Sequence, residues 1–552
     1  MNELVFVPLG GIGEIGMNLA LYGYGPADKR EWIAVDCGVS FAGPEFPGVD
    51  LVLPDISFLE ARKGQLKGLV ITHAHEDHYG AVLDLWPRLK VPVYATAFTA
   101  ALLAAKREGE PGAAKVPVTL FKAGDRFDLG PFSIEAVNVT HSIPEPVALA
   151  IRTPAGTVLH TGDWKIDPTP ALGDPTDEAR LRQIGDEGVL AIVCDSTNAM
   201  REGVSPSERD VNQSLTEIIR EAEGRVAITT FSSNVGRIRS IAEAARDADR
   251  QVLLMGRSMK RVADVANELG YLDGIPPFLS EQDFGYIPRE KAVIILTGSQ
   301  GEPRAALARL SRDEHPSVAL SRGDTVIFSS RSIPGNEKAI LEIKNDLIER
   351  GIKVVEDHDR LVHVSGHPRR SELRQMYEWI RPKIAVPAHG EAQHLRAHAE
   401  LARELGVGEI VSLRDGKMVR LAPGPAEIID EVPFGRWYKD GYLIGTAEQM
   451  GIGERRRLAL AGHVSVLVEV DQKLELVDDP QVVAMGLPEK DEEGESIVEA
   501  LIDAAGGAVE SIPRGRRKDL ETVREAVRRA VRAEANDAWG KKPAVTVFVS
   551  RS

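Results

Sequence analysis

The sequence predicts an α/β protein of several domains. At 552 residues the chain is long enough for three or four domains, each with a core of its own. Short apolar runs alternate with segments of helical periodicity, the pattern of parallel sheets covered by helices. A hydrophobic content of 43% beside 27% charged residues is ordinary for a globular chain.

The first element carries glycines spaced like those of a dinucleotide-binding loop. Gly11–Gly16 (G-I-G-E-I-G) follows an apolar strand, and Asp36 comes after it at the spacing of the acidic residue in that loop. Such a loop requires a crossover helix, whereas glycines and a proline interrupt this segment, which reads as two strands, 18–24 and 32–36. We expect the glycines to let the backbone pass close to a neighbouring site.

The next element is a histidine-rich loop, 72–78 (T-H-A-H-E-D-H), directly after an apolar strand. It places four potential metal ligands within six residues, in a chain with only 13 histidines. A tight turn can direct alternate side chains at two metal ions. The loop therefore indicates a dinuclear metallohydrolase, while a solvated polar turn is the alternative.

Ionisable residues recur where apolar strands end. The strands at 32–35, 69–72, 134–140, 157–161, 189–194 and 384–388 are followed by Asp36, His73, His141, Asp163, Asp195 and His389. Ligands collect at the carboxyl ends of strands along one edge of an α/β sheet. We therefore expect these side chains to form one site.

Coordination chemistry suggests a role for each residue. Imidazole suits zinc, and a carboxylate can bridge two ions. We assign His73, His75 and His141 to one metal and Asp77, His78 and His389 to the other, with Asp163 bridging them. Asp36 is expected to orient the ligand imidazoles, although it can also simply cap a turn. Two zinc ions are expected, or manganese, which carboxylate-rich sites also accept.

These motifs resemble the metallo-β-lactamase superfamily: D-C-G at Asp36, H-A-H-E-D-H, His141 and Gly162-Asp163. Further along, C-D-S-T-N (Asp195), H-V-S-G-H (His367) and P-A-H-G-E (His389) are similar to three motifs of the β-CASP nucleases. The opening P-L-G-G-I-G-E-I-G-M-N and the chain length resemble the ribonuclease J family, over roughly residues 1–450.

The resemblance implies an αββα metallo-β-lactamase sandwich with an inserted β-CASP αβ domain and a small C-terminal α+β domain. The expected boundaries are 1–205 and 361–423 for the sandwich, 206–360 for the insert, 424–452 for a linker and 453–552 for the last domain. That last domain is expected to contain strands at 458–470, 474–485 and 544–549 and helices at 496–504 and 520–533. In the family it promotes dimerisation, and one face of its second helix is basic, which suits RNA, a partner or plain solvent.

The insert offers loops that can hold phosphate. Its predicted strands at 225–231, 292–296 and 325–328 are each followed by Ser-rich or Gly-rich loops that lead to helices. Such loops present hydroxyls and backbone N–H groups to anions, although the same residues favour ordinary helix caps. The candidate phosphate-binding residues are Ser232, Ser233, Asn234, Ser330 and Arg331.

A further candidate segment, 363–367, follows a strand-like run at 360–362. By family resemblance, His367 lies near the scissile phosphate and protonates the leaving oxygen. His363, Ser365, Gly366 and His367 are candidates for holding phosphate there. We expect His367, Asp77 and Asp195 to act in catalysis.

The resemblance implies a zinc-dependent ribonuclease for single-stranded RNA. It is expected to combine 5′→3′ exonuclease action on 5′-monophosphorylated ends with endonuclease action, in RNA maturation and mRNA decay. A hydroxide between the metals would leave 5′-phosphate products. The alternatives are a DNA-directed β-CASP repair nuclease and a non-nuclease hydrolase of the same superfamily.

Composition bounds the cellular setting. The net charge of −16 argues against a protein that merely coats nucleic acid. No apolar run reaches the roughly 20 residues that cross a bilayer, the N-terminus does not resemble a signal peptide, and the chain has 2 cysteines. We expect a cytoplasmic homodimer, away from membranes, whose partners include a helicase or other ribonucleases of an RNA-degradation complex.

Overall fold

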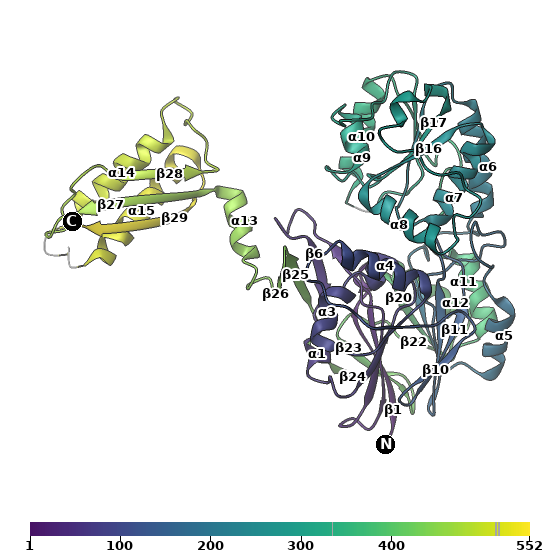
Figure 1. Cartoon of the computed structure of the whole chain (residues 1–552). Helices are drawn as coiled ribbons and strands as arrows, with labels where there is room; N and C mark the ends of the chain where they lie inside the picture. The colour runs from purple at the N-terminus through teal and green to yellow at the C-terminus, as the bar shows by residue number, and fades with distance from the viewer. Residues whose placement is uncertain (334, 514–515, 517–518) are drawn as a thin grey trace. The chain divides into compact units, whose positions relative to one another are not determined.

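The structure, a computed structural model, describes residues 1–333, 335–513, 516 and 519–552. The chain divides into two compact units, the first made of residues 1–40 and 53–435 and the second of residues 41–52 and 436–552. The first unit contains two large sheets that pack together and a third, all-parallel sheet (Figure 1). The α/β fold class expected from the sequence is confirmed.

The first sheet of the sandwich has eight strands. Their spatial order is β24 (Glu427–Glu431), β23 (Lys417–Ala422), β1 (Glu3–Gly10), β3 (Leu19–Gly25), β4 (Glu31–Val35), β7 (Leu66–Val70), β8 (Val93–Ala95) and β9 (Val118–Leu120). The second sheet has seven. Their order is β10 (Arg126–Leu129), β11 (Phe132–Asn138), β12 (Val147–Thr153), β13 (Gly156–His160), β14 (Ala191–Asp195), β20 (Ile384–Ala388) and β22 (Glu409–Ile410).

The inner faces of these sheets share one apolar core. Phe6 and Tyr22 of the first sheet pack with Ile134, Leu149 and Val386 of the second. The outer faces are covered by helices. These are α1 (Ser57–Glu60), α2 (Glu76–Tyr79), α3 (Val82–Leu89), α4 (Ala97–Glu108), α5 (Glu178–Glu187), α11 (Arg370–Ile380) and α12 (Ala392–Glu404). This is an αββα sandwich (Figure 1).

Strand direction brings the polar residues to one edge of each sheet. Strands β13, β14 and β20 are consecutive and parallel, so Asp163, Asp195 and His389 follow at the same edge. Strand β11 runs in the same direction as β13, because both are antiparallel to β12, and His141 follows β11. In the first sheet, parallel β4 and β7 place Asp36 at the same edge as the histidine-rich loop.

The inserted domain is built on five parallel strands, in the order β16 (Gln251–Met255), β17 (Ala292–Leu296), β15 (Val226–Thr229), β18 (Thr325–Phe328) and β19 (Lys353–Val355). Its helices are α6 (Glu208–Glu221), α7 (Val235–Asp247), α8 (Arg257–Glu268), α9 (Ala306–Ser311) and α10 (Glu337–Glu349), with short 3-10 turns at Phe284–Tyr286 and Arg289–Lys291. Helices α9 and α10 cover one face, and α6, α7 and α8 lie on the other (Figure 1).

A buried arginine fastens this domain to the segment that returns to the sandwich. The side chain of Arg237 is fully buried, pairs with Glu208 at 2.8 Å and donates to the Val362 carbonyl at 2.9 Å. Ser329 donates to the same carbonyl at 2.7 Å. An unpaired buried guanidinium is costly, so these contacts fix the end of β18 against the 361–367 segment.

The second unit contains two smaller sheets. One has the order β26 (Leu443–Gly445), β25 (Arg436–Asp440), β6 (Leu51–Pro54) and β5 (Ser40–Phe41), with its last strands continuing into the first unit. The other has the order β28 (Gln481–Met485), β27 (His463–Val470) and β29 (Ala544–Arg551). Helices α13 (Ile452–Ala461), α14 (Ile497–Ser511) and α15 (Leu520–Trp539) accompany them, and α14 and α15 share a core with the three-stranded sheet.

Four local predictions were wrong, the first being the strand at 474–485, which begins only at Gln481. Residues 424–452 are not a bare linker, because β24, β25 and β26 form there and the boundary between the units falls after Gly435. The predicted strand at 458–470 begins only at His463, since the preceding Leu and Ala residues extend helix α13 until Gly462, whose positive φ ends it. Residues 360–362 form no strand, because Val362 gives its carbonyl to Arg237 and Ser329 instead of to a sheet.

Two short elements complete the architecture. Strands β2 (Ile12–Gly13) and β21 (Gly390–Glu391) pair in parallel, which places the N-terminal glycine segment beside the residue that follows His389. Among the residues that the structure describes, no helix is both long enough and apolar enough to cross a bilayer.

Glu135 on β11 is a buried carboxylate held by arginines. It lies 2.6 Å from Arg180, 2.8 Å from Arg152 and 3.0 Å from Arg126. Burial raises the pKa of Glu135, but the hydrogen bond from Arg180 and the charge of Arg152 outweigh it and lower that pKa from 4.5 to about 2. The ionised form is therefore favoured by folding.

We predict that Glu135→Gln lowers the free energy of unfolding at pH 7 by about 3 kcal/mol. The folded-state pKa lies below the unfolded value, so this stabilisation is present above pH 4.5 and disappears as the pH falls toward 2. Denaturant unfolding at several pH values measures the difference between variant and wild type. Glu178→Gln, which removes an exposed ion pair with Arg182, is the control and should cost under about 0.5 kcal/mol. An equal loss for Glu135→Gln at pH 2 and pH 7 would contradict the account.

Candidate metal centre

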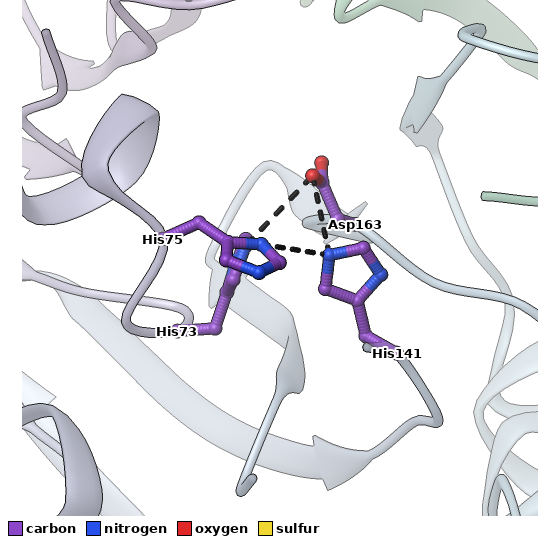
Figure 2. Close-up of side chains that lie close together, drawn as sticks. All are labelled: His73, His75, His141 and Asp163. Carbon is purple, nitrogen blue, oxygen red and sulfur yellow. Dashed lines mark hydrogen bonds and ion pairs between the residues drawn. The ribbon is translucent and has the colours of Figure 1, made fainter. Parts of the chain in front are cut away.

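Three imidazoles and one carboxylate form a first group of potential ligands. The Nδ1 atom of His75 lies 3.1 Å from Nε2 of His73 and 3.0 Å from Nε2 of His141. An Oδ2 atom of Asp163 lies 3.8 Å and 3.7 Å from the same two Nε2 atoms. Figure 2 shows the four side chains converging from the histidine-rich loop and two strand ends. Three nitrogens with one carboxylate suit zinc.

A second group shares Asp163 and lies beside the first. Asp163 Oδ2 is 3.3 Å from His78 Nε2 and 3.6 Å from His389 Nε2. Asp77 Oδ2 is 3.6 Å from His78 Nε2 and 3.9 Å from His389 Nε2. Within each group the ligand atoms all lie within 4.8 Å of one another, so each group can enclose one ion.

Asp163 stands between the two groups. It is 3% exposed, and one of its carboxylate oxygens faces the four Nε2 atoms of His73, His78, His141 and His389. Its other oxygen, Oδ1, is buried with no hydrogen-bond partner among the described residues. A buried carboxylate oxygen without a partner is costly, and a cation would satisfy it. The donor set therefore fits two metal ions with a shared carboxylate.

Burial favours the neutral imidazoles that bind metals. Burial lowers the pKa of His73 and His141 well below the usual value, and it lowers the pKa of His75 to about 4. Burial also lowers the pKa of His78, but the charges of Asp163, Asp77 and Asp36 outweigh this effect and raise that pKa above its usual value.

Hydrogen bonds outside the two groups fix which ring nitrogen faces inward. His78 Nδ1 donates to Asp36 at 2.7 Å, the position expected for Asp36, and His141 Nδ1 donates to the Gly366 carbonyl at 2.7 Å. Each bond uses the outer nitrogen, so that Nε2 faces the other ligand atoms of its group. Asp36 is itself held by the backbone N–H of Thr72 at 2.8 Å.

Asn18 is a residue that the sequence reasoning missed. Its Oδ1 accepts from His389 Nδ1 at 2.8 Å, and its Nδ2 donates to the Asp77 carbonyl at 3.0 Å. It therefore connects ligands of the second group that are far apart in the chain. Its role could have been suspected from its position directly after the glycine segment, although that segment was expected only to pass near the site.

His367 lies at the open side of the metal groups. Its Nδ1 donates to Asp195 Oδ2 at 2.7 Å and lies 3.8 Å from Asp163 Oδ2. Burial lowers the pKa of His367, but the charges of Asp195 and Asp163 outweigh it and raise that pKa to about 9. Asp195 is fixed in turn by the Thr197 backbone N–H at 2.8 Å.

The candidate phosphate-binding residues fall into separate places. Ser365 Oγ accepts from Asn198 Nδ2 at 2.8 Å and from the His367 N–H at 3.3 Å, and its own proton has no acceptor among the described residues. Asn234 caps helix α7 through the Arg237 N–H at 2.9 Å, the ordinary role weighed for it, while Ser232 and Ser233 are half-buried beside it. The remaining candidates, Ser330, Arg331 and His363, line a pocket of the inserted domain instead.

Family models match most of the chain in four segments. They are a β-lactamase superfamily domain at residues 31–229, a ribonuclease J β-CASP domain at 223–347, a zinc-dependent metallo-hydrolase RNA specificity domain at 351–412 and a ribonuclease J C-terminal domain at 450–552. Together with the sandwich and its paired ligand groups, these matches define a β-CASP metallo-hydrolase. This confirms the expected sandwich with its inserted domain.

Comparison with known proteins narrows the class. The chain is 66% identical to ribonuclease J of Sinorhizobium meliloti, covering 100% of this chain and 98% of that protein. It is 39% identical to ribonuclease J of Mycolicibacterium smegmatis, covering 98% and 96%. A solved structure of a protein of unknown function from Enterococcus faecalis matches with a TM-score of 0.51 at 18% identity, covering 76% of this chain and 100% of that one, and shows the fold alone. The chain belongs to the ribonuclease J family. The zinc dependence expected of it agrees with its match to the zinc-dependent metallo-hydrolase domain.

We predict that His141→Ala removes about one metal ion per chain and leaves the second group loaded. His141 touches only the first group, whereas Asp163 is shared. Elemental analysis of the purified variant measures zinc against protein. His315→Ala, in the inserted domain and outside both groups, is the matched control. Two ions retained by His141→Ala would show that the first group is wrongly assigned.

Proposed function

We propose that this chain is a zinc-dependent ribonuclease that removes nucleotides from 5′-monophosphorylated RNA in the 5′→3′ direction and also cleaves internally. The observation that carries the proposal is the pair of ligand groups that share Asp163 beside the His367–Asp195 pair. Membership in the ribonuclease J family supports the substrate.

The chain's own residues then have distinct tasks. Two divalent ions, held by the two ligand groups that share Asp163, would supply positive charge beside the phosphate and would lower the pKa of bound water. Asp77, whose side chain is 30% exposed, reaches the open side of the groups and can accept a proton from the attacking water. His367, oriented by Asp195, donates a proton to the leaving 3′-oxygen, so the product keeps its 5′-phosphate.

Ser365 and its neighbours position the phosphate. Because Ser365 Oγ already accepts two hydrogen bonds, its remaining proton is directed outward and can be donated to a phosphate oxygen. Gly366 lies against the ring of His141, where an added Cβ would fall 2.5 Å from Nδ1. A side chain there would displace a metal ligand, so only glycine lets this backbone and the imidazole of His141 lie so close together.

RNA is favoured over DNA because the match at 351–412 is to an RNA specificity domain. That segment contains Ser365, Gly366 and His367, which lie beside the metal groups. A DNA-directed nuclease remains the alternative that the next experiment separates.

We predict that purified protein releases mononucleotides from 5′-monophosphorylated RNA and some internal fragments, with little action on single-stranded DNA. A 5′-triphosphate should slow exonuclease action. This larger end group does not fit the place near Ser365 where a monophosphate is held. Labelled substrates resolved by gel electrophoresis measure both products. Equal cleavage of DNA, or no dependence on the 5′ end, would contradict the proposal.

The variant His367→Gln tests the chemical step. It should retain two zinc ions and bind RNA normally while hydrolysis falls by about 10²–10⁴-fold, the range for loss of a general acid. Full-speed cleavage by this variant would remove His367 from the catalytic step and leave the metal groups unaffected.

We also propose that the second unit forms a homodimer through the open face of its three-stranded sheet. Val483 (62% exposed), Met485 (68%) and Phe548 (57%) lie exposed on this sheet, with Leu467 opposite Phe548 in the register. A cluster of exposed apolar side chains favours a protein partner. RNA is less suitable for this unit, since three arginines of α15, Arg524, Arg528 and Arg529, pair with glutamates on the same helix.

We predict that Phe548→Glu converts the dimer to a monomer in sedimentation at micromolar concentration. A charge in the middle of an apolar interface is left unpaired and desolvated. Ile428→Glu, at an exposed apolar position on a strand of the first unit, is the control and should stay dimeric. A Phe548→Glu variant that sediments like the wild type would place the interface elsewhere.

A further inference from the structure

Helix α4 carries a lysine on its buried face. Thr99, Leu102 and Leu103 are buried at helical spacing, and Lys106 continues the same face with 6% of its surface exposed. A leucine would fill such a position without electrostatic penalty, whereas a buried ammonium is unfavourable unless it is paired. The packing of the helix alone therefore does not account for the charge.

The ammonium of Lys106 contacts both ends of helix α2. It donates to Glu76 Oε2 at 2.7 Å and to the Gly80 carbonyl at 2.9 Å. Glu76 is the first residue of α2, and Gly80 follows its last residue. Between these two contacts lie Asp77 and His78, which both belong to the second ligand group. Lys106 thus holds the segment that presents two ligands to one ion.

Helix α2 is too short to be stable by itself. It has 4 residues, and a single helical turn loses more conformational entropy than its hydrogen bonds return. Its N-cap residue, His75, makes no side-chain capping bond. Carbonyls at the end of a helix lack partners within it, and Lys106 supplies a donor and a positive charge there. The turn therefore depends on contacts with other elements.

The lysine contacts the face of α2 that is opposite to the ligands. At about 100° per residue, residues 76, 79 and 80 share one face of a helical turn, and residues 77 and 78 point the other way. On the shared face, the Tyr79 hydroxyl donates to Glu76 Oε1 at 3.3 Å, and Lys106 Nζ lies 5.5 Å from the centre of the Tyr79 ring. Both carboxylate oxygens of Glu76 are therefore engaged. This cluster opposes rotation of the turn about its axis, which would redirect both ligands.

Helix α4 is itself fixed near its start. The Phe98 N–H donates to Glu145 at 2.8 Å, and the hydroxyl of Tyr271 in the inserted domain donates to the same carboxylate at 2.7 Å. The rings of Phe98 and Tyr271 also meet edge to face, with their centres 5.7 Å apart. A side chain on a firmly held helix is placed more precisely than one on a loop. Lys106 therefore reaches α2 from a fixed support.

We propose that Lys106 is a positioning residue for the second ligand group. Through Glu76 and Gly80 it keeps α2 in the orientation that Asp77 and His78 need to hold one ion. Loss of such an outer contact typically lowers metal affinity by about 10–100-fold. Where RNA hydrolysis is the readout the proposal rests on the proposed ribonuclease function, whereas the readout of metal binding is independent of it.

The first test is removal of zinc from the full-length holoenzyme by a chelator of known affinity. Lys106→Met keeps an apolar chain of similar length without the ammonium, and it should lower the zinc affinity of the second group by tenfold or more while the first group stays loaded. Lys115→Met removes the same charge from an exposed position beyond the end of α4 and should release zinc like the wild type. Equal zinc affinity in Lys106→Met and wild type would overturn the proposal.

A double-mutant cycle with Glu76→Gln tests whether the lysine acts through its partner. Glu76→Gln keeps the shape of the side chain, removes its charge and should also weaken the second ion. If the two residues act as a unit, the double variant binds that ion no more weakly than Lys106→Met does. Losses in affinity that multiply would show independent roles and reject the proposal. If Lys106→Met does not fold, Glu76→Gln alone decides, and unchanged zinc binding by it rejects the proposal.

Hydrolysis of 5′-monophosphorylated RNA gives the second readout. The second ion and Asp77 act in the chemical step, so Lys106→Met should lower kcat by tenfold or more with little change in KM. Saturating zinc should restore much of the lost kcat by mass action. A kcat that zinc does not restore, together with a lowered melting temperature, would show a merely structural role and overturn the proposal.

Failure of this proposal and failure of the proposed function give different results. A protein whose second ion depends on Lys106 but which cleaves no RNA would refute the ribonuclease function and leave the positioning role intact. A protein that cleaves RNA, and whose second ion is indifferent to Lys106→Met, would do the reverse.

Discussion

The structure depends on one buried carboxylate. Asp163 faces four imidazoles that come from the histidine-rich loop, from the end of β11 and from the residue after β20. Without a cation, so many convergent nitrogens and an unpaired oxygen would be unfavourable in a dry site. Strands β7, β11, β13 and β20 end near this carboxylate. The imidazoles are held around it by the hydrogen bonds that they donate to Asp36, Asn18 and the Gly366 carbonyl. Much of the sandwich serves to keep Asp163 away from water and to hold the imidazoles around it.

The inserted domain is attached to that frame through polar contacts. The carbonyl of Val362 receives both Arg237 and Ser329, and five residues later the chain reaches His367. At a second place, Tyr271 of the inserted domain donates to Glu145 at 2.7 Å, and Glu145 also accepts from the Phe98 N–H at 2.8 Å. Attachment at two places fixes the domain more firmly than either contact alone. A buried guanidinium that must stay paired resists separation of the two domains.

Much of this arrangement could be predicted from the sequence. Apolar runs that end in Asp or His identify strand ends, and the spacing within H-A-H-E-D-H leaves few other uses for so many ligands. Two of the contacts that hold the ligands could not be predicted, because Asn18 and the Gly366 carbonyl reach the imidazoles only through tertiary packing. Local propensity also misjudged 424–452, where glycines and prolines suggested a linker although alternating residues pair as strands. Asn234 shows the opposite case, since a residue favoured for phosphate binding is used as a helix cap.

The pairing of Asn18 with His389 has a consequence for how the enzyme comes into being. The bond joins residues separated by 371 positions, and the ligand that it orients is made only after the whole inserted domain. A growing chain on the ribosome therefore carries the histidine-rich loop for most of its synthesis without a complete second group of ligands. A nuclease that cleaves RNA is synthesised next to its own mRNA. Because His389 comes late in the chain, the second group of ligands, and with it the activity, is complete only after translation has passed His389.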